Sequence, residues 1–183
     1  MKGQFFLLGA IVLCVMFFLA LPSVSTMNTS DMSDLSALSE NLEKELPMAL
    51  NLAMEEDNSP AKLNNFIDFL KTRTSERYLS LEILDVVAVP DPDNPGDIDV
   101  YAGNWLGRAV TLKITVESTE ITLNLNDGET DSRSFSGLGS DIDVKIRFED
   151  RIISAQSSRD KTNLYAYMKL SRGENSIVKE IIA

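Results

Sequence analysis

The sequence predicts an α+β protein in which an N-terminal membrane helix and a helical hairpin precede an antiparallel β-sandwich. Three observations predict this class. An unbroken apolar run occupies residues 5–21, apolar residues recur every three or four positions over 31–76, and the period changes to two afterwards. We therefore divide the chain into a signal or anchor helix (1–21), a spacer (22–30), a helical hairpin (31–76) and a sandwich (77–183).

The apolar run follows Lys2 and ends before Pro22. As a helix it would be about 25 Å long, slightly short of a hydrocarbon core of about 30 Å. A lysine that precedes such a run stays inside the cell, so the acidic remainder of the chain is expected outside the cytoplasm. The run therefore predicts a single-pass protein of the cell membrane, held by residues 5–21, with its C-terminal domain outside the cytoplasm.

Two other fates of this segment are open. Ser23-Val24-Ser25 has the small-x-small form that a leader peptidase accepts, and cleavage after Ser25 would give a secreted protein. Lys2-Gly3-Gln4 followed by FFLLGAIV resembles the leaders of archaeal pilin-like surface proteins. This resemblance implies that the apolar helix stays on the mature chain and packs into a filament. The glutamate usually found five residues into the mature helix of that family would fall at Leu8.

Composition excludes several functions. The formal charge of −11 argues against nucleic-acid binding, because a binder neutralises phosphates with clustered lysine and arginine. The chain has no histidine, and therefore lacks the commonest general base and metal ligand. Its only cysteine, Cys14, lies in the apolar run, so the exported part has no disulfide. Since no catalytic motif occurs either, we expect a protein that is not an enzyme.

The region 31–76 predicts two helices. The apolar residues of the first share one face, with Pro47 expected to kink or interrupt it. They are Leu35, Leu38, Leu42, Leu46, Ala49 and Ala53. Ser59 and Pro60 predict the start of the second helix, as an N-cap followed by proline in the first turn, and the helical pattern fades near Glu76. We expect this hairpin to pack on the protein's own domain.

After Arg77 the pattern predicts about eight short strands with turns every 8 to 12 residues, which favours an antiparallel sandwich over a barrel. The expected strands are 78–89, 98–101, 108–116, 121–125, 131–135, 142–148, 164–170 and 177–182. The clearest alternation lies in the third, and Asn126-Asp127-Gly128 predicts a turn after the fourth.

One part of this region has a family resemblance. The alternating strand from Val110 to Val116 is followed by a second from Ile121 to Leu125, then by Asp127-Gly128-Glu129-Thr130 and Phe135. This succession resembles immunoglobulin-like domains of archaeal and bacterial surface proteins. The resemblance covers roughly 35 residues and implies an Ig-like β-sandwich, without implying any binding or catalytic residue.

Three local features are candidate sites. Calcium prefers hard oxygen ligands, and four carboxylates alternate with spacers around Gly96; they belong to Asp91, Asp93, Asp97 and Asp99. The alternative for this stretch is a solvated turn between strands. Asn28 begins the only N-x-[ST] sequence and is a candidate for glycosylation. Trp105 is the only tryptophan; an exposed indole would anchor a ligand, whereas packing in the core is the commoner role and the one we expect.

The sequence thus predicts a non-enzymatic, envelope-anchored extracytoplasmic protein that presents a β-sandwich for interaction or scaffolding. Its expected partners are the membrane and other envelope proteins or itself, and not nucleic acid. No cofactor is expected apart from calcium at the acidic loop. The alternatives are a pilin-like subunit of a surface filament and a secreted glycan-binding or glycan-processing domain.

Overall fold

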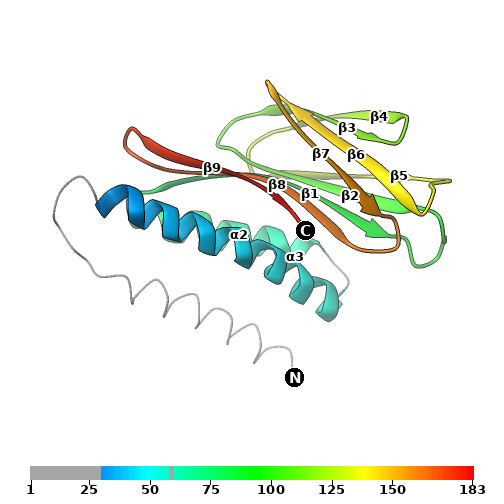
Figure 1. The fold of residues 1–183 in the computed structure, drawn as a ribbon, viewed down its shortest axis with the longest axis horizontal. Coiled ribbons are helices and arrows are strands. Elements are labelled where there is room, and N and C mark those ends of the chain that lie inside the picture. The colour runs from blue at the N-terminus through cyan, green and yellow to red at the C-terminus, as the bar shows by residue number, and fades with distance from the viewer. Residues whose placement is uncertain (1–29, 58–59) are drawn as a thin grey trace. The chain divides into compact units, whose positions relative to one another are not determined.

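A computed structural model describes residues 30–57 and 60–183, which form two helices and nine strands (Figure 1). The helices are α2 (Ser30–Asp57) and α3 (Ala61–Ser75). The strands are β1 (Ser80–Pro90), β2 (Ile98–Trp105), β3 (Val110–Val116), β4 (Thr119–Leu125), β5 (Glu129–Phe135), β6 (Asp141–Phe148), β7 (Arg151–Ser158), β8 (Asn163–Arg172) and β9 (Asn175–Ile182).

The strands form two antiparallel sheets that pack face to face as a β-sandwich. One sheet has five strands in the order β5-β2-β1-β8-β9, and the other has four in the order β4-β3-β6-β7. The core between them takes alternate residues from each strand, such as Leu84 and Val86 of β1 and Leu112 and Ile114 of β3. Phe148 and Tyr167 meet edge to face across this core, with ring centroids 5.3 Å apart.

The central strands of the five-stranded sheet, β1, β2 and β8, are largely buried on both faces. Residues of β1 that alternate with the sandwich core, including Ile83, Asp85 and Val87, are buried as well, and they point to the opposite face. Figure 1 shows α3 and the part of α2 from residue 35 onwards along that face. The apolar stripes of both helices are buried, namely Leu35, Leu38, Leu42, Leu46, Leu50 and Ala53 of α2 and Leu63, Ile67 and Leu70 of α3. The domain therefore has a helical layer, a middle sheet and an outer sheet.

The predicted fold class is wrong. An α+β protein with a membrane helix, a helical hairpin and an Ig-like sandwich was expected, whereas the described residues form mostly antiparallel β-structure with only two helices. In residues 30–57 and 60–183, no helix is long and apolar enough to span a membrane. The predicted membrane helix, residues 5–21, lies outside the described residues, as do Asn28 and Ser59. The coarser prediction of a β-sandwich is confirmed.

Two elements differ from the expected ones for physical reasons. Helix α2 continues through Pro47, because Leu46 and Leu50 on either side keep their buried positions against the domain. Strand β7 was not predicted, because in its sequence RIISAQSS only Ile153 is buried and no apolar alternation marks it. It is held instead by its pairing with β6.

Tyr78 ends the connection from α3 to β1 in a left-handed conformation. Its φ is +59° and its side chain is 92% exposed, so no contact of the ring explains the conformation. The backbone N–H of Leu79 donates to the carbonyl of Thr74 at 3.0 Å, as at a helix C-terminus where glycine is preferred. A tyrosine here therefore holds local strain.

Replacing Tyr78 with glycine is expected to stabilise the protein by about 0.5–1 kcal/mol, because glycine adopts positive φ without a Cβ clash. Urea unfolding at equilibrium measures the change. Tyr78→Ala is the matched control, since it removes the same ring and keeps the strain. Equal stability of the two variants would contradict the explanation.

Candidate functional site

The most unusual polar group of the described domain is a buried carboxyl in the middle sheet. Asp85 is at the centre of β1 and is only 4% exposed. Its cross-strand neighbours are Gly103 of β2 and Ala166 of β8, which are too small to fill the space around its side chain. Because it lies on the face of β1 opposite the sandwich core, the carboxyl is enclosed between the sheet and the helical layer.

Trp105 is the side chain that satisfies this carboxyl. Its indole Nε1–H donates to Oδ1 of Asp85 at 3.1 Å, and the tryptophan is 6% exposed. The prediction that Trp105 is packed in the structure is thereby confirmed. An indole enclosed in this way is not available to stack on a ligand, so the alternative role as a binding anchor does not fit this conformation.

Burial raises the pKa of Asp85 from its usual 3.8 to about 7. The hydrogen bonds from Trp105 and from its own backbone N–H act in the opposite direction and only partly offset the loss of solvation. No cation of the described chain is paired with Asp85. A carboxyl with these surroundings gains or loses a proton near neutral pH, and the stability of the folded state therefore depends on pH in that range.

Gly103 is required by the close approach of these two side chains. A Cβ at this position would lie 2.6 Å from Oδ1 of Asp85 and 2.9 Å from Nε1 of Trp105. Distances this short are not tolerated, so any larger residue would force the hydrogen-bonded pair apart. Glycine at position 103 and tryptophan at position 105 are therefore both explained by the packing of the carboxyl.

Asn104 fixes the connection between β2 and β3 beside this pair. It is fully buried, and its Nδ2 donates to the carbonyl of Arg108 at 2.8 Å and to that of Leu125 at 3.0 Å. Its Oδ1 accepts the backbone N–H of Leu106 at 3.1 Å. The side chain thus satisfies two backbone groups of the connection between β2 and β3 and one at the end of β4. Buried backbone groups that no strand pairs need such partners.

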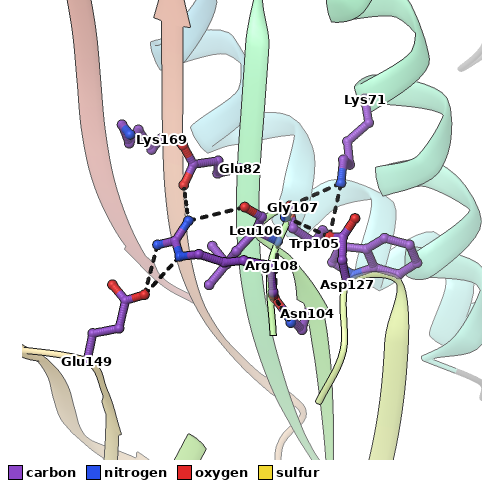
Figure 2. A network of polar contacts seen from close by, with 10 residues as sticks. All are labelled: Lys71, Glu82, Asn104, Trp105, Leu106, Gly107, Arg108, Asp127, Glu149 and Lys169. Carbon is purple, nitrogen blue, oxygen red and sulfur yellow. Dashed lines mark hydrogen bonds and ion pairs between the residues drawn. The ribbon is translucent and has the colours of Figure 1, made fainter. Parts of the chain in front are cut away.

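A charged network surrounds this connection (Figure 2). Lys71 of α3 donates to the carbonyl of Trp105 at 3.2 Å and lies 3.4 Å from Asp127, whose carboxylate accepts the N–H of Gly107 at 2.7 Å. These contacts join the helical layer to the loops at the end of β2 and β4. Because Lys71 and Asp127 are both partly exposed, they contribute little stability as an ion pair.

Arg108 connects the two sheets within the same network. Its guanidinium lies 2.9 Å from Glu82 of β1 and 2.9 Å from Glu149 in the turn between β6 and β7. Lys169 of β8 lies 2.9 Å from the other oxygen of Glu82. Partial burial by itself raises the pKa of Glu82, but the hydrogen bonds from Lys169 and Arg108 outweigh it and the pKa is lowered. The pairing therefore stabilises the folded state at pH values above the usual pKa of glutamate. This stabilisation is lost as the pH falls through the lowered pKa of Glu82 in the folded protein.

The predicted calcium ligands lie in the loop between β1 and β2 and at the start of β2, engaged in local hydrogen bonds. The Asp91 carboxylate accepts the N–H of Asp93 at 2.9 Å and Nδ2 of Asn94 at 2.8 Å. Asp97 accepts the N–H of Gly137 at 3.1 Å, and Asp99 accepts the hydroxyl of Ser134 at 2.6 Å. Among the residues with described positions, no group of three or more acidic or cysteine side chains is placed to hold a metal ion.

Calcium binding at this loop stays a prediction, and titration calorimetry tests it directly. Binding by the four aspartates would release or absorb heat and raise the melting temperature, and Asp91→Asn with Asp97→Asn would abolish both effects. Magnesium chloride at the same ionic strength is the control. A titration without heat and without a change in melting temperature would remove the hypothesis.

Asp85 was not predicted as a site residue, although one signal was present. It is a single acidic residue inside the apolar run from Leu84 to Val89, and a strand buried on both faces rarely carries a charge. Comparison with protein-family models and with curated proteins finds no match.

Proposed function

We propose that this protein is a non-enzymatic, envelope-attached protein that presents its β-sandwich outside the cytoplasm for interaction or scaffolding. Residues 5–21, preceded by Lys2, support attachment, because such a run directs the rest of the chain across the membrane. The acidic charge of the chain and its lack of histidine support an interaction role over catalysis or nucleic-acid binding.

The observation that carries the proposal is the unequal covering of the two sheets. The central strands of the five-stranded sheet, β1, β2 and β8, are largely buried on both faces, whereas the four-stranded sheet is buried only on its inner face. Its outer face is polar and exposed, with side chains such as Lys113, Thr122, Arg147 and Gln156. An antiparallel sheet with one solvent-exposed face can present that face to a partner.

The intact mass of the natively expressed protein, taken from separated membrane and soluble fractions, tests the attachment. A membrane-bound chain that retains residues 5–21 is expected, and a membrane-impermeant amine reagent added to whole cells should label Lys113 of the exposed face. A soluble chain that begins at Thr26 would instead indicate a secreted domain. A chain that begins at Gln4 and sediments as fibres would favour the pilin-like subunit.

A further inference from the structure

The two sheets of the sandwich differ by one strand, and the difference lies at the β7 side. β7 lies over β8: the hydroxyl of Tyr165 in β8 is 2.6 Å from that of Ser157, and the guanidinium of Arg151 is 4.7 Å from the ring centroid of Tyr167. β8 is the fourth strand of the five-stranded sheet, and β9 extends beyond it. No strand of the four-stranded sheet therefore faces β9.

The face of β9 that points toward the sandwich is correspondingly exposed. Val178 and Ile182 are paired with Lys169 and Tyr165 of β8 and share their face of the sheet, which for Tyr165 is the core face. Tyr165 is 1% exposed, whereas Val178 is 39% exposed and Ile182 is 51% exposed. Two apolar side chains thus continue the core surface beyond the point where the opposite sheet ends.

β7 itself is an unprotected edge strand. It is the last strand of its sheet, pairs with β6 on one side, and has eight residues with a single charged side chain, Arg151. Natural edge strands usually avoid further pairing by means of proline, lysine or short length. β7 uses none of these, and its Ile152 is 52% exposed. About half of the backbone N–H and C=O groups of such a strand point outward. The carbonyl of Ser158 at the end of β7 already accepts Nδ2 of Asn163 at 2.9 Å, so an added strand would pair with the outward groups before it.

We propose that the β7 edge accepts one extended segment of a partner polypeptide, which adds a fifth strand to the four-stranded sheet and covers Val178 and Ile182. This inference rests on the proposed interaction role and names its site. Addition of a strand to a free edge gains affinity from main-chain hydrogen bonds and specificity from alternate side chains. Since successive strands are about 4.8 Å apart, the overhang of one strand, β9, gives room for one strand.

This geometry and the local charges define the partner. Edge-to-edge pairing of β7 with β7 of a second copy would bring the two overhanging β9 strands into the same space, so a folded sheet edge does not fit. Glu180 lies between Val178 and Ile182 on the exposed face of β9. The matching strand therefore carries apolar, cationic and apolar residues at alternate positions on the side that faces β9.

Hydrogen exchange of the full-length chain in detergent micelles tests the proposal. The probe is a capped seven-residue peptide with the sequence Thr-Val-Thr-Lys-Thr-Val-Thr. In the control peptide, glutamate replaces the lysine. We expect the outward amides of β7 to exchange fast without peptide and to be protected by the lysine peptide alone. The amides of β5, the edge strand at the other side of the sandwich, should be unchanged.

Two protein variants separate strand addition from adhesion to any apolar surface. Val178→Thr combined with Ile182→Thr should weaken binding of the lysine peptide by about tenfold, because two apolar contacts are lost. Met48→Thr on α2 removes another exposed apolar side chain and should leave binding unchanged. Slow exchange of β7 without peptide, dimerisation through β7, or no protection at about 1 mM peptide would overturn the proposal. None of these results depends on where the protein is located, so they are distinct from a failure of the proposed function.

Discussion

Replacing Asp85 with asparagine is expected to raise the free energy of unfolding at pH 8 and to remove most of its dependence on pH between 4 and 7. The carboxyl has a pKa of about 7 in the folded protein and 3.8 as its ordinary value. Between these values the folded state binds a proton that the unfolded state has lost, so stability falls as the pH rises. Above pH 7 the cost is complete and is of the order of 4 kcal/mol.

Asparagine matches the protonated carboxyl in shape and keeps an oxygen for Nε1 of Trp105. The variant and the natural protein should therefore be similar in stability near pH 4 and diverge as the pH rises. Urea unfolding of the full chain in detergent at pH 4.5, 6 and 8, followed by circular dichroism, measures this. Asp143→Asn on the exposed face of β6 is the matched control, because it makes the same substitution at a carboxyl that is not buried. Parallel pH profiles for Asp85→Asn and the natural protein would show that Asp85 is ionised in the fold at little cost.

The sequence predicted those strands in which side chains alternately face the solvent and the core. β3 and β6 were expected at nearly their observed bounds, because Thr111, Lys113 and their counterparts face solvent on the outer sheet. β1 was expected within residues 78–89 but without a clear alternation, since a strand buried on both faces loses the period of two. β7 escaped prediction because its place is set by pairing with β6 and by contacts to β8, which are not local in sequence.

The site was less predictable than the fold. Each residue of the Asp85 cluster has an ordinary local explanation: Gly103 as a turn residue, Asn104 as a loop residue, Trp105 as core. Only the register between β1 and β2, which places Asp85 opposite Gly103, shows that these residues lie around one buried carboxyl. The acidic loop is the opposite case, because the close spacing of Asp91, Asp93, Asp97 and Asp99 in sequence predicted a shared ligand. In the structure Asp91, Asp97 and Asp99 accept hydrogen bonds from separate local donors.

Replacing Asn104 with alanine is expected to destabilise the protein by about 3 kcal/mol. The change removes the donors to the carbonyls of Arg108 and Leu125 and the acceptor for the N–H of Leu106, all in a buried position. Urea unfolding measures the loss. Asn124→Ala is the matched control, because Asn124 is exposed and its oxygen only accepts a hydrogen bond from Thr111; it should cost less than about 0.5 kcal/mol.

Hydrogen exchange distinguishes a local role of Asn104 from a merely global one. The N–H of Leu106 depends on the Asn104 side chain, whereas the N–H of Gly128 donates to the Asn104 backbone carbonyl, which alanine retains. In Asn104→Ala, exchange at Leu106 should therefore accelerate more than exchange at Gly128. Equal acceleration at both amides would mean that the whole domain opens as one unit. A loss as small as that of Asn124→Ala would mean that Lys71, Asp127 and Arg108 hold these loops without the buried amide.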